Sequence, residues 1–234
     1  MDTKHTIEPI GYIQTPFKEK FGIPRQPNLC AAKGTIVLNE TLFSADSVNG
    51  LLSHSHIWLL FLFDQNIEKG WKETVRPPRL GGNKKVGVFA TRSTFRPNAI
   101  GMSVVKLLSV EQVDKQLHIG VQGVDLVNNT PIVDIKPYIP YSDAIIDATS
   151  SLANNEPLQT LNVVFSLDAE ASLKNLKIKD ETRKLIVDVL SQDPRPSYKK
   201  NKLDSKIYGI TLENINITWQ VTNEICEVVD VKAI

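Results

Sequence analysis

Cysteine is scarce in this chain, and long apolar runs are absent from it. The 234 residues contain two cysteines, Cys30 and Cys226, which lie far apart and form no Cys-x-x-Cys pair. This excludes a disulfide framework and a cysteine-rich zinc site, and it favours a reducing compartment. The longest apolar run, residues 57–63, has the length of a strand, and the first residues lack the apolar segment of a signal peptide. We therefore expect a cytoplasmic protein that does not span a membrane.

Familiar catalytic signatures are missing as well. There is no GxGxxG after a first strand, no P-loop, no Ser/His/Asp set and no glycosidase-like pair of acids. His54 and His56 would share a strand face and could bind a metal ion, but His5 and His118 lie in unrelated contexts and offer no third ligand. We therefore expect hydrogen-bonded histidines at the start of a strand and no metal site.

What the chain does contain is a series of short segments with strand character. β-branched content and flanking turn residues predict strands at residues 7–15, 33–38, 57–63, 85–90, 101–113, 116–121 and 132–138. Asp114-Lys115 is typical of a hairpin turn, and a short helix fits residues 43–51. Short strands between Gly- and Pro-rich turns favour a barrel or a sandwich over alternating βαβ units.

A polar connection at residues 142–160 is typical of a domain boundary. We predict an N-terminal domain at residues 1–145 and a C-terminal domain at residues 155–234. The second domain is expected to have a helix at 180–192 and strands at 161–166, 206–212, 215–221 and 226–231. One helix face should be buried, because helical spacing relates Thr182, Leu185, Ile186, Val189 and Leu190. The predicted fold class is therefore mainly β, with a small α+β C-terminal domain.

Positive charge is concentrated in two places, although the net charge is only +1. Between residues 69 and 96 there are eight basic residues and one acid, Glu73. A second basic group is opposed only by Asp204 and consists of Arg195, Lys199, Lys200, Lys202 and Lys206. Two such groups fit a bound polyanion such as nucleic acid, and a solvated face is the alternative.

The stretch from Gly87 to Gly101 is the richest in polar donors. Residues 86–90 have the pattern of a buried strand, and the segment that follows contains both Arg92 and Arg96. An apolar strand that leads at once into clustered donors is typical of a binding loop. Two arginines there require anionic or strongly polar partners.

Other polar segments also suit ligand contact, each with a plainer alternative. Asp64 and Gln65 end an apolar strand and would face a pocket or simply form a turn. Arg76 and Arg79 flank two prolines before Gly81-Gly82, in a loop suited to phosphate or to ordinary solvent exposure.

Two later segments are of the same kind. The turn Asn128-Asn129-Thr130 exposes backbone groups that could bind an adenine edge or a carboxylate. On the following strand, Asp134 and Lys136 share a face and could pair with each other. Residues 193–200 place Arg195, Tyr198 and two lysines on a Pro-rich loop, as single-stranded RNA binding requires, and a structural cap is the alternative.

These segments together resemble the TsaA-like family. The matching motifs are Pro24-Arg-Gln-Pro27, His54-x-His56-x-Trp58, Val75-Arg-Pro-Pro-Arg-Leu-Gly-Gly82, Gly87-Val-Phe-Ala-Thr-Arg-Ser-x-x-Arg-Pro-Asn-x-Ile-Gly101, Asp125-Leu-x-x-x-Thr-Pro-x-x-Asp-Ile-Lys-Pro-Tyr138 and Asp193-Pro-Arg-Pro-x-Tyr198. They extend over nearly the whole chain, including a C-terminal domain that shorter members lack. The resemblance implies a homodimeric β-barrel that binds S-adenosylmethionine without a Rossmann sheet.

The activity that the resemblance implies is methyl transfer to a tRNA. The methyl group would go to N6 of threonylcarbamoyladenosine immediately 3′ of the anticodon in threonine tRNA. The implied tRNA contacts are Arg76, Arg79, Arg195, Tyr198, Lys199 and Lys200. The implied cofactor contacts are Gln26, Pro27, Asn28, Asp64, Gln65, Arg92, Met102, Val127, Asn128, Asn129 and Thr130.

The sequence departs from the family pattern at Asn28, where a small residue is common, and at Asp64, where histidine is common. Backbone contacts are the ones expected to persist at these two positions. Arg96 is expected to brace the Pro-Asn turn or a neighbouring subunit rather than to bind the cofactor.

Methyl transfer to N6 requires a group that accepts the N6 proton, because the N6 lone pair is delocalised into the ring and the carbamoyl group. Asp134 is our candidate for this catalytic acceptor, and Tyr138 is a candidate for positioning the substrate. Two other functions stay open: a non-enzymatic RNA-binding module that senses S-adenosylmethionine, and a methyltransferase that acts on another substrate.

Overall fold

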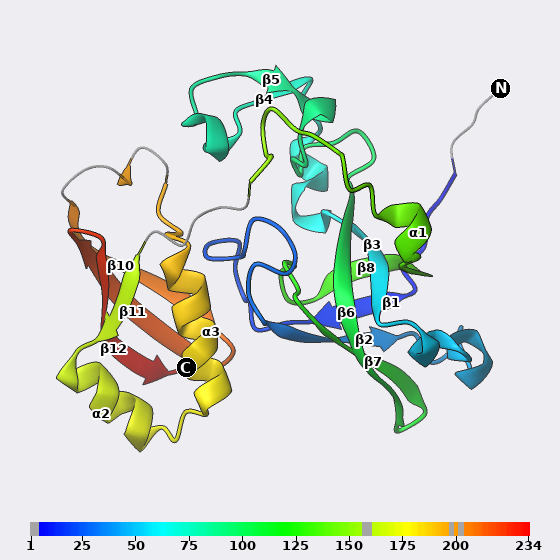
Figure 1. The fold of residues 1–234 in the computed structure, drawn as a ribbon. Coiled ribbons are helices and arrows are strands. Elements are labelled where there is room, and N and C mark those ends of the chain that lie inside the picture. The colour runs from blue at the N-terminus through cyan, green and yellow to red at the C-terminus, as the bar shows by residue number, and fades with distance from the viewer. Residues whose placement is uncertain (1–4, 156–160, 197–198, 201–203) are drawn as a thin grey trace.

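The computed structural model describes residues 5–155, 161–196, 199–200 and 204–234. In this part of the chain the strands form a closed six-stranded barrel and a four-stranded sheet, with a small two-stranded sheet outside both (Figure 1). The mainly β fold class, with a barrel in the first half and an α+β unit in the second, is confirmed.

The barrel wall is antiparallel throughout. Its strands, in order around the wall, are β1 (Gly11–Gln14), β2 (Lys33–Leu38), β7 (Gln116–Gln122), β6 (Ile100–Val113), β3 (His56–Leu62) and β8 (Thr130–Pro137). Pairing of β8 with β1, where Ile132 lies opposite Gly11, closes the barrel. Asp114 and Lys115, both in the left-handed region, form the predicted hairpin turn between β6 and β7.

Alternation of apolar and polar residues makes these segments strands, because successive side chains point to opposite faces. On β3, Ile57, Leu59 and Phe61 are buried in the barrel interior, and the residues between them are only partly buried. Gly101 of β6 lies against the ring of Phe61, where a Cβ atom would collide with it. The interior is therefore filled by side chains, and ligand contact is left to the loops and the outer wall.

The second sheet has the order β10-β11-β12-β9. It consists of β9 (Asn162–Phe165), β10 (Asp204–Leu212), β11 (Ile215–Thr222) and β12 (Ile225–Ala233), and β9 alone runs parallel to its neighbour, β12. Two helices, α2 (Leu167–Asn175) and α3 (Asp180–Ser191), pack beside this sheet (Figure 1). The buried residues of α3 include all five of the predicted stripe.

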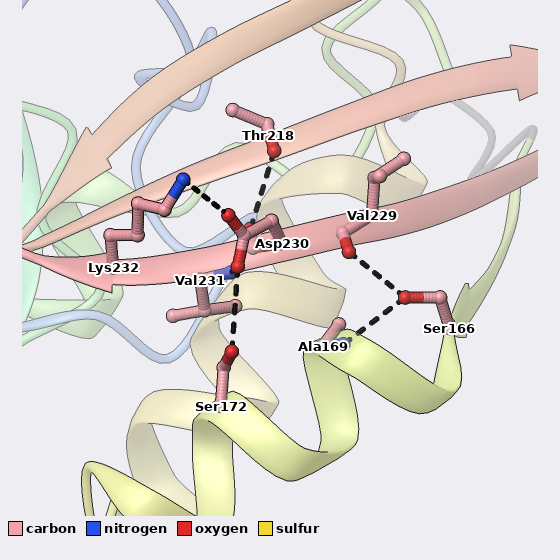
Figure 2. A network of polar contacts seen from close by, with 8 residues as sticks. All are labelled: Ser166, Ala169, Ser172, Thr218, Val229, Asp230, Val231 and Lys232. Atoms are coloured by element: carbon pink, nitrogen blue, oxygen red, sulfur yellow. Dashed lines mark hydrogen bonds and ion pairs between the residues drawn. The ribbon is translucent and has the colours of Figure 1, made fainter.

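Helix α2 was not expected from the sequence, since its apolar residues form only a weak stripe, and only Ala169 and Leu173 are buried. Polar contacts with β12 anchor it instead, as Figure 2 shows. The Ser166 hydroxyl accepts a bond from the Ala169 N–H at 3.1 Å, which caps the helix, and donates to the Val229 carbonyl at 2.9 Å. Asp230 forms an ion pair with Lys232 at 2.8 Å, and this contact lowers the pKa of the carboxyl.

The loop between β1 and β2, residues 15–32, joins the two sheets. Phe17 is 1% exposed and forms an isolated bridge with Leu212 of β10. The Pro16 carbonyl accepts a bond from the Glu213 N–H at 2.8 Å, and the rings of Phe21 and Tyr208 stack at 6.5 Å. The two sheets therefore share one hydrophobic core across this loop.

Two predicted elements are wrong. The strand expected at residues 85–90 is limited to β5 (Val86–Gly87), which pairs with β4 (Thr74–Val75), and a 3₁₀ turn, η5 (Val88–Ala90), follows. Phe89 is 75% exposed there, so the apolar run is not a core strand. The helix expected at residues 43–51 is replaced by two 3₁₀ turns, η1 (Ala45–Val48) and η2 (Leu51–Ser53), because Gly50 in the left-handed region separates them.

The remaining short elements are η3 (Asp64–Lys69), η4 (Pro78–Leu80) and α1 (Pro140–Asp143). The indole N–H of Trp58 on β3 donates to Asp143 at 3.1 Å and holds α1 against the barrel. Among the described segments, each helix is too short or too polar to cross a bilayer.

Candidate functional site

Arg92 and Gln26 lie together although 66 residues separate them in the sequence. The Arg92 guanidinium donates to the Gln26 side-chain oxygen at 2.6 Å, and it remains exposed. Two of the predicted cofactor contacts are thus adjacent, on the β1–β2 loop and on the loop that follows η5. An exposed guanidinium held in place by an amide is suited to binding a carboxylate.

Arg96 has a different part from Arg92. Its guanidinium donates to the Thr91 carbonyl at 2.6 Å and to the Val88 carbonyl at 3.4 Å. These bonds fold the segment after β5 into a compact loop. Arg96 thus has a structural role, but it braces residues 88–91 rather than the expected Pro-Asn turn, and Arg92 is left exposed.

Asn28 anchors the β1–β2 loop to the barrel. Its φ of 64° lies in the left-handed region, which asparagine adopts more readily than most residues. Its N–H donates to the Gly123 carbonyl at 2.9 Å, and its side-chain amide donates to the Val104 carbonyl at 3.0 Å. Gly123 has no alternative here, because a Cβ atom would collide with the Asn28 side chain. The Asn28 side-chain amide and backbone N–H are thus both engaged by the protein, and the expected backbone contact with the cofactor stays a prediction.

Asp125 lies within one of the family motifs, but sequence reasoning missed it as a site residue. Its carboxylate accepts a bond from the Ser103 hydroxyl at 2.6 Å. Burial raises the pKa of Asp125 to about 6, against the opposing effects of Ser103 and of the positive charge of Arg92. In the sequence, its one distinguishing feature was an acid between two apolar residues, Val124 and Leu126, both of which are buried in the structure.

Met102 and Asp134 lie on the outer wall of the barrel. Met102 of β6 is 51% exposed and pairs with Leu60 of β3, which in turn pairs with Asp134 of β8. Asp134 forms an ion pair with Lys136 at 2.9 Å and accepts the Ile135 N–H at 2.9 Å. The predicted pairing of Asp134 with Lys136 is confirmed, and substrate would compete with Lys136 for this carboxylate.

Tyr138 belongs to an aromatic group at the end of β8. Its ring centroid lies 5.9 Å from that of Trp58 and 6.4 Å from that of His56. The Nδ1 atom of His56 is 2.9 Å from the Ser55 hydroxyl, as expected for a hydrogen-bonded histidine. Tyr138 thus offers a hydroxyl beside flat apolar surfaces on which a base could stack.

The other predicted cofactor contacts lie in two places. Asp64 and Gln65 open η3 as exposed residues, directly after Phe63, whose N–H donates to the Ala99 carbonyl at 2.7 Å. The Asn128 side chain accepts the Thr15 N–H at 3.0 Å and is therefore tied to β1. The turn from Val127 to Thr130 borders a hollow of about 400 Å³, whose lining includes Asn128, Asn129, Lys18, Lys33 and Glu213.

The tRNA contact expected of Arg195 stays a prediction, and the structure gives this side chain a structural role. Arg195 and Asp193 are each 3% exposed, and two bonds of 2.8 and 2.9 Å join the guanidinium to the carboxylate. A buried, bidentate pair of this kind shapes the loop and holds the guanidinium away from solvent. Tyr198 lies outside the described residues, as does the side chain of Arg79, whereas Arg76 is exposed.

The loop that contains Lys199 and Lys200 lies beside the expected cofactor loop. Gln192 donates its side-chain amide to the Leu29 carbonyl at 3.0 Å. Burial lowers the pKa of Lys200, and the positive charges of Arg25 and Arg195 lower it further against the opposing effect of Asp193. Arg25, next to Gln26, thus acts electrostatically on Lys200. The C-terminal unit brings its basic loop to the same end of the molecule as Arg92 and Gln26.

Comparisons with known proteins show the family of the chain. The family model of the tRNA-methyltransferase O N-terminal domain matches residues 12–144, and that of the TrmO C-terminal domain matches residues 158–234. The chain therefore belongs to the TrmO family, and the resemblance seen in the sequence motifs is confirmed.

Individual relatives agree with this. The tRNA (adenine(37)-N6)-methyltransferase of Escherichia coli strain K12 is 46% identical over 219 residues, 93% of each chain. A "Probable S-adenosyl-L-methionine-binding protein" of Methanothermobacter thermautotrophicus is 32% identical over 148 residues, 62% of this chain and 97% of that protein. A crystal structure of TrmO from Pseudomonas aeruginosa has a TM-score of 0.79 and 35% identity, covering 99% of this chain and 100% of the other.

The residues around Arg92 fit S-adenosylmethionine, the cofactor that these similarities support. The cofactor carries a carboxylate, an ammonium group, a sulfonium and an adenine. Arg92 is suited to the carboxylate, and the acids Asp64 and Asp125 are suited to the cationic groups. The N–H groups of Asn128 and Asn129 are bonded to the carbonyls of Phe17 and Ile13, so a contact of this turn with the adenine is left to its carbonyl groups.

We predict that Arg92→Ala abolishes measurable binding of S-adenosylmethionine, because it removes the exposed guanidinium without touching the core. Isothermal titration calorimetry measures the affinity, and circular dichroism checks the fold. Arg76→Ala, the loss of another exposed arginine, is the matched control and should bind with wild-type affinity. Unchanged affinity in Arg92→Ala contradicts the assignment.

We also predict that Arg195→Met destabilises the protein by about 3–5 kcal/mol, because it leaves the Asp193 carboxylate buried without its partner. Urea unfolding measures the loss. The double variant Asp193→Asn/Arg195→Met removes both charges and should regain much of the stability. Equal stability of the single and double variants would show that the pair is not structural.

Proposed function

We propose that this protein methylates N6 of threonylcarbamoyladenosine, immediately 3′ of the anticodon in threonine tRNA, with S-adenosylmethionine as the methyl donor. The broader activity, S-adenosylmethionine-dependent N6-methylation of tRNA, follows from membership of a family that includes the E. coli tRNA (adenine(37)-N6)-methyltransferase. The proposal also includes a homodimer and a cytoplasmic location. Exposed apolar side chains on the wall of β6, such as Met102 and Leu108, support the dimer.

One structural observation carries the proposal: the basic loop of the C-terminal unit begins beside the loop that contains Gln26. Gln192, at the end of α3 directly before the basic loop, donates to the Leu29 carbonyl, and Arg25 is near enough to Lys200 for its positive charge to lower the pKa of that lysine, so cationic groups of both loops gather in one place. A tRNA methyltransferase needs cationic groups for the phosphates close to the site of methyl transfer. A protein that only bound the cofactor would not need this arrangement.

The protein's main task in this reaction is alignment. The bound cofactor supplies an activated methyl group, so the chain must hold the nucleophilic nitrogen in line with it and exclude water. Asp134 is proposed to accept the N6 proton and Tyr138 to position the base. Because Lys136 occupies one Asp134 oxygen and the Ile135 N–H the other, the proton would go to a remaining lone pair.

A single assay tests the proposed function. Purified protein is incubated with methyl-labelled S-adenosylmethionine and total tRNA from cells with and without the threonylcarbamoyl modification. We expect label in threonine tRNA from the modified cells and none from the unmodified cells. The label should migrate with an N6-methylated nucleoside after digestion.

The same assay separates the alternatives. Absence of label with both tRNA pools, together with retained cofactor binding, supports a non-enzymatic RNA-binding module. Label that does not depend on the threonylcarbamoyl group supports a methyltransferase with another substrate. Either result overturns the proposal.

The basic loop allows a further prediction about tRNA affinity. Lys199→Ala/Lys200→Ala should weaken tRNA binding and make the slope of log K against log [salt] shallower by roughly 1.5, since each lysine at a phosphate contributes about 0.7–0.9. Filter binding between 50 and about 300 mM salt measures the slope. Lys174→Ala/Lys184→Ala, which removes two exposed lysines of α2 and α3, is the control. A slope equal to that of the wild type would remove these lysines from the RNA interface.

A further inference from the structure

Asp125 is an ionisable residue beside the expected cofactor contacts, and it was not among the site residues expected from the sequence. It lies between β7 and β8, and the adjacent residues Val124 and Leu126 are buried. Its carboxylate accepts the Ser103 hydroxyl at 2.6 Å, and Ser103 is itself buried on β6. A hydrogen bond of this length orients the carboxyl group firmly.

The surroundings of Asp125 oppose its ionisation. Burial raises the pKa to about 6, although the Ser103 bond and the positive charge of Arg92 favour the charged form. The other ionisable group that faces it is Cys30 of the β1–β2 loop, and burial raises the pKa of that thiol to about 11, so it stays neutral near pH 6. The folded chain therefore holds the Asp125 proton more tightly than the unfolded chain does, and its ionisation lowers stability as pH rises through 6.

Three segments converge on Asp125. Arg92, whose charge acts on the carboxyl, is bonded to Gln26 at 2.6 Å. Asn28 is bonded to Gly123, two residues before Asp125, and to Val104, the neighbour of Ser103. The carboxyl thus belongs to the group of residues expected to hold the cofactor, and a buried acid with a raised pKa in such a group is a functional candidate.

S-adenosylmethionine carries two cationic groups and one carboxylate, so a site that contains Arg92 needs negative charge as well, and Asp64, the other acid expected there, is exposed to solvent. We propose that Asp125 is a positioning residue of the cofactor site, where its carboxylate, oriented by Ser103, supplies the negative charge that the cationic cofactor needs beside Arg92. The inference rests on binding of S-adenosylmethionine at Arg92. Neither Ser103 nor Asp125 reacts.

The consequence is that cofactor binding releases a proton. A cation near Asp125 favours the carboxylate and lowers its pKa below the value of about 6 in the free protein. Affinity is therefore greatest above pH 6 and falls as pH decreases through 6. The fall is at most tenfold for each pH unit, until the pKa of the bound state is reached.

Calorimetry on the wild-type protein tests this directly. Titration of S-adenosylmethionine at pH 6 in two buffers of different ionisation enthalpy gives the number of protons released. We expect about half a proton for each cofactor bound, because a group with a pKa of about 6 is half protonated there. This measurement needs no variant and does not depend on activity.

Asp125→Asn provides the second measurement. The amide oxygen can still accept the Ser103 hydroxyl, but the negative charge is lost, so we expect about tenfold weaker binding at pH 7 and no proton release at pH 6. The control is Asp114→Asn, the same substitution at the exposed β6–β7 turn, which should behave as the wild type. Thermal unfolding checks that both variants fold.

S-adenosylhomocysteine, which lacks the sulfonium charge, identifies the cationic group. Proton release with both ligands assigns the contact to the ammonium group, and release with S-adenosylmethionine alone assigns it to the sulfonium; both results support the proposal. Binding that requires Arg92 but releases no proton, or wild-type affinity in Asp125→Asn, overturns it. Loss of Arg92 dependence would instead refute the cofactor site itself.

Discussion

The packing of the β1–β2 loop against the second sheet is the contact on which the rest of this molecule depends. Phe17 and Phe21 pack against β10, and the Glu213 N–H, directly after β10, donates to the Pro16 carbonyl at the start of the loop. A loop of this length would be poorly ordered on a barrel surface alone, since its backbone entropy must be offset by burial. Here the second sheet supplies that burial.

Because the second sheet fixes the start of the β1–β2 loop, the residues at the end of the loop can make defined contacts. Gln26 contacts Arg92, Asn28 contacts the barrel wall, and Leu29 accepts the bond from Gln192. The segments proposed to bind the cofactor and the tRNA thus meet on a single stretch of chain, without any glycine-rich phosphate loop. A filled barrel has no interior site, so its chemistry is built at the rim from loops that are well separated in sequence.

The sequence was a good guide where a simple period governs the structure. The barrel strands and the buried stripe of α3 follow from alternation and helical spacing, and both were predicted. The sequence was a poor guide where contacts between distant residues determine the local conformation. Phe89 is apolar but exposed, in a turn whose ends Arg96 holds through the carbonyls of Val88 and Thr91, and α2 has little apolar periodicity to reveal it.

The candidate site also contains residues that the sequence predicted and residues that it did not. Motifs brought Gln26 and Arg92 into one list, and the fold brings them into contact. Arg195 was assigned to tRNA because it shares a Pro-rich loop with lysines and an aromatic residue, but in the fold it is buried with its neighbour Asp193. Asp125 was missed because a single acid in an apolar segment has no distinguishing spacing. Burial is a property of the folded chain, and no local pattern encodes it.

The shared core also limits how this protein could be divided or recombined. Phe17, Phe21 and Gly22 all face the second sheet. A barrel truncated near residue 155 would therefore expose the apolar side chains of this loop to water. Each half of the chain therefore stabilises the other, and replacing either half with an unrelated domain would remove packing that the remaining half needs.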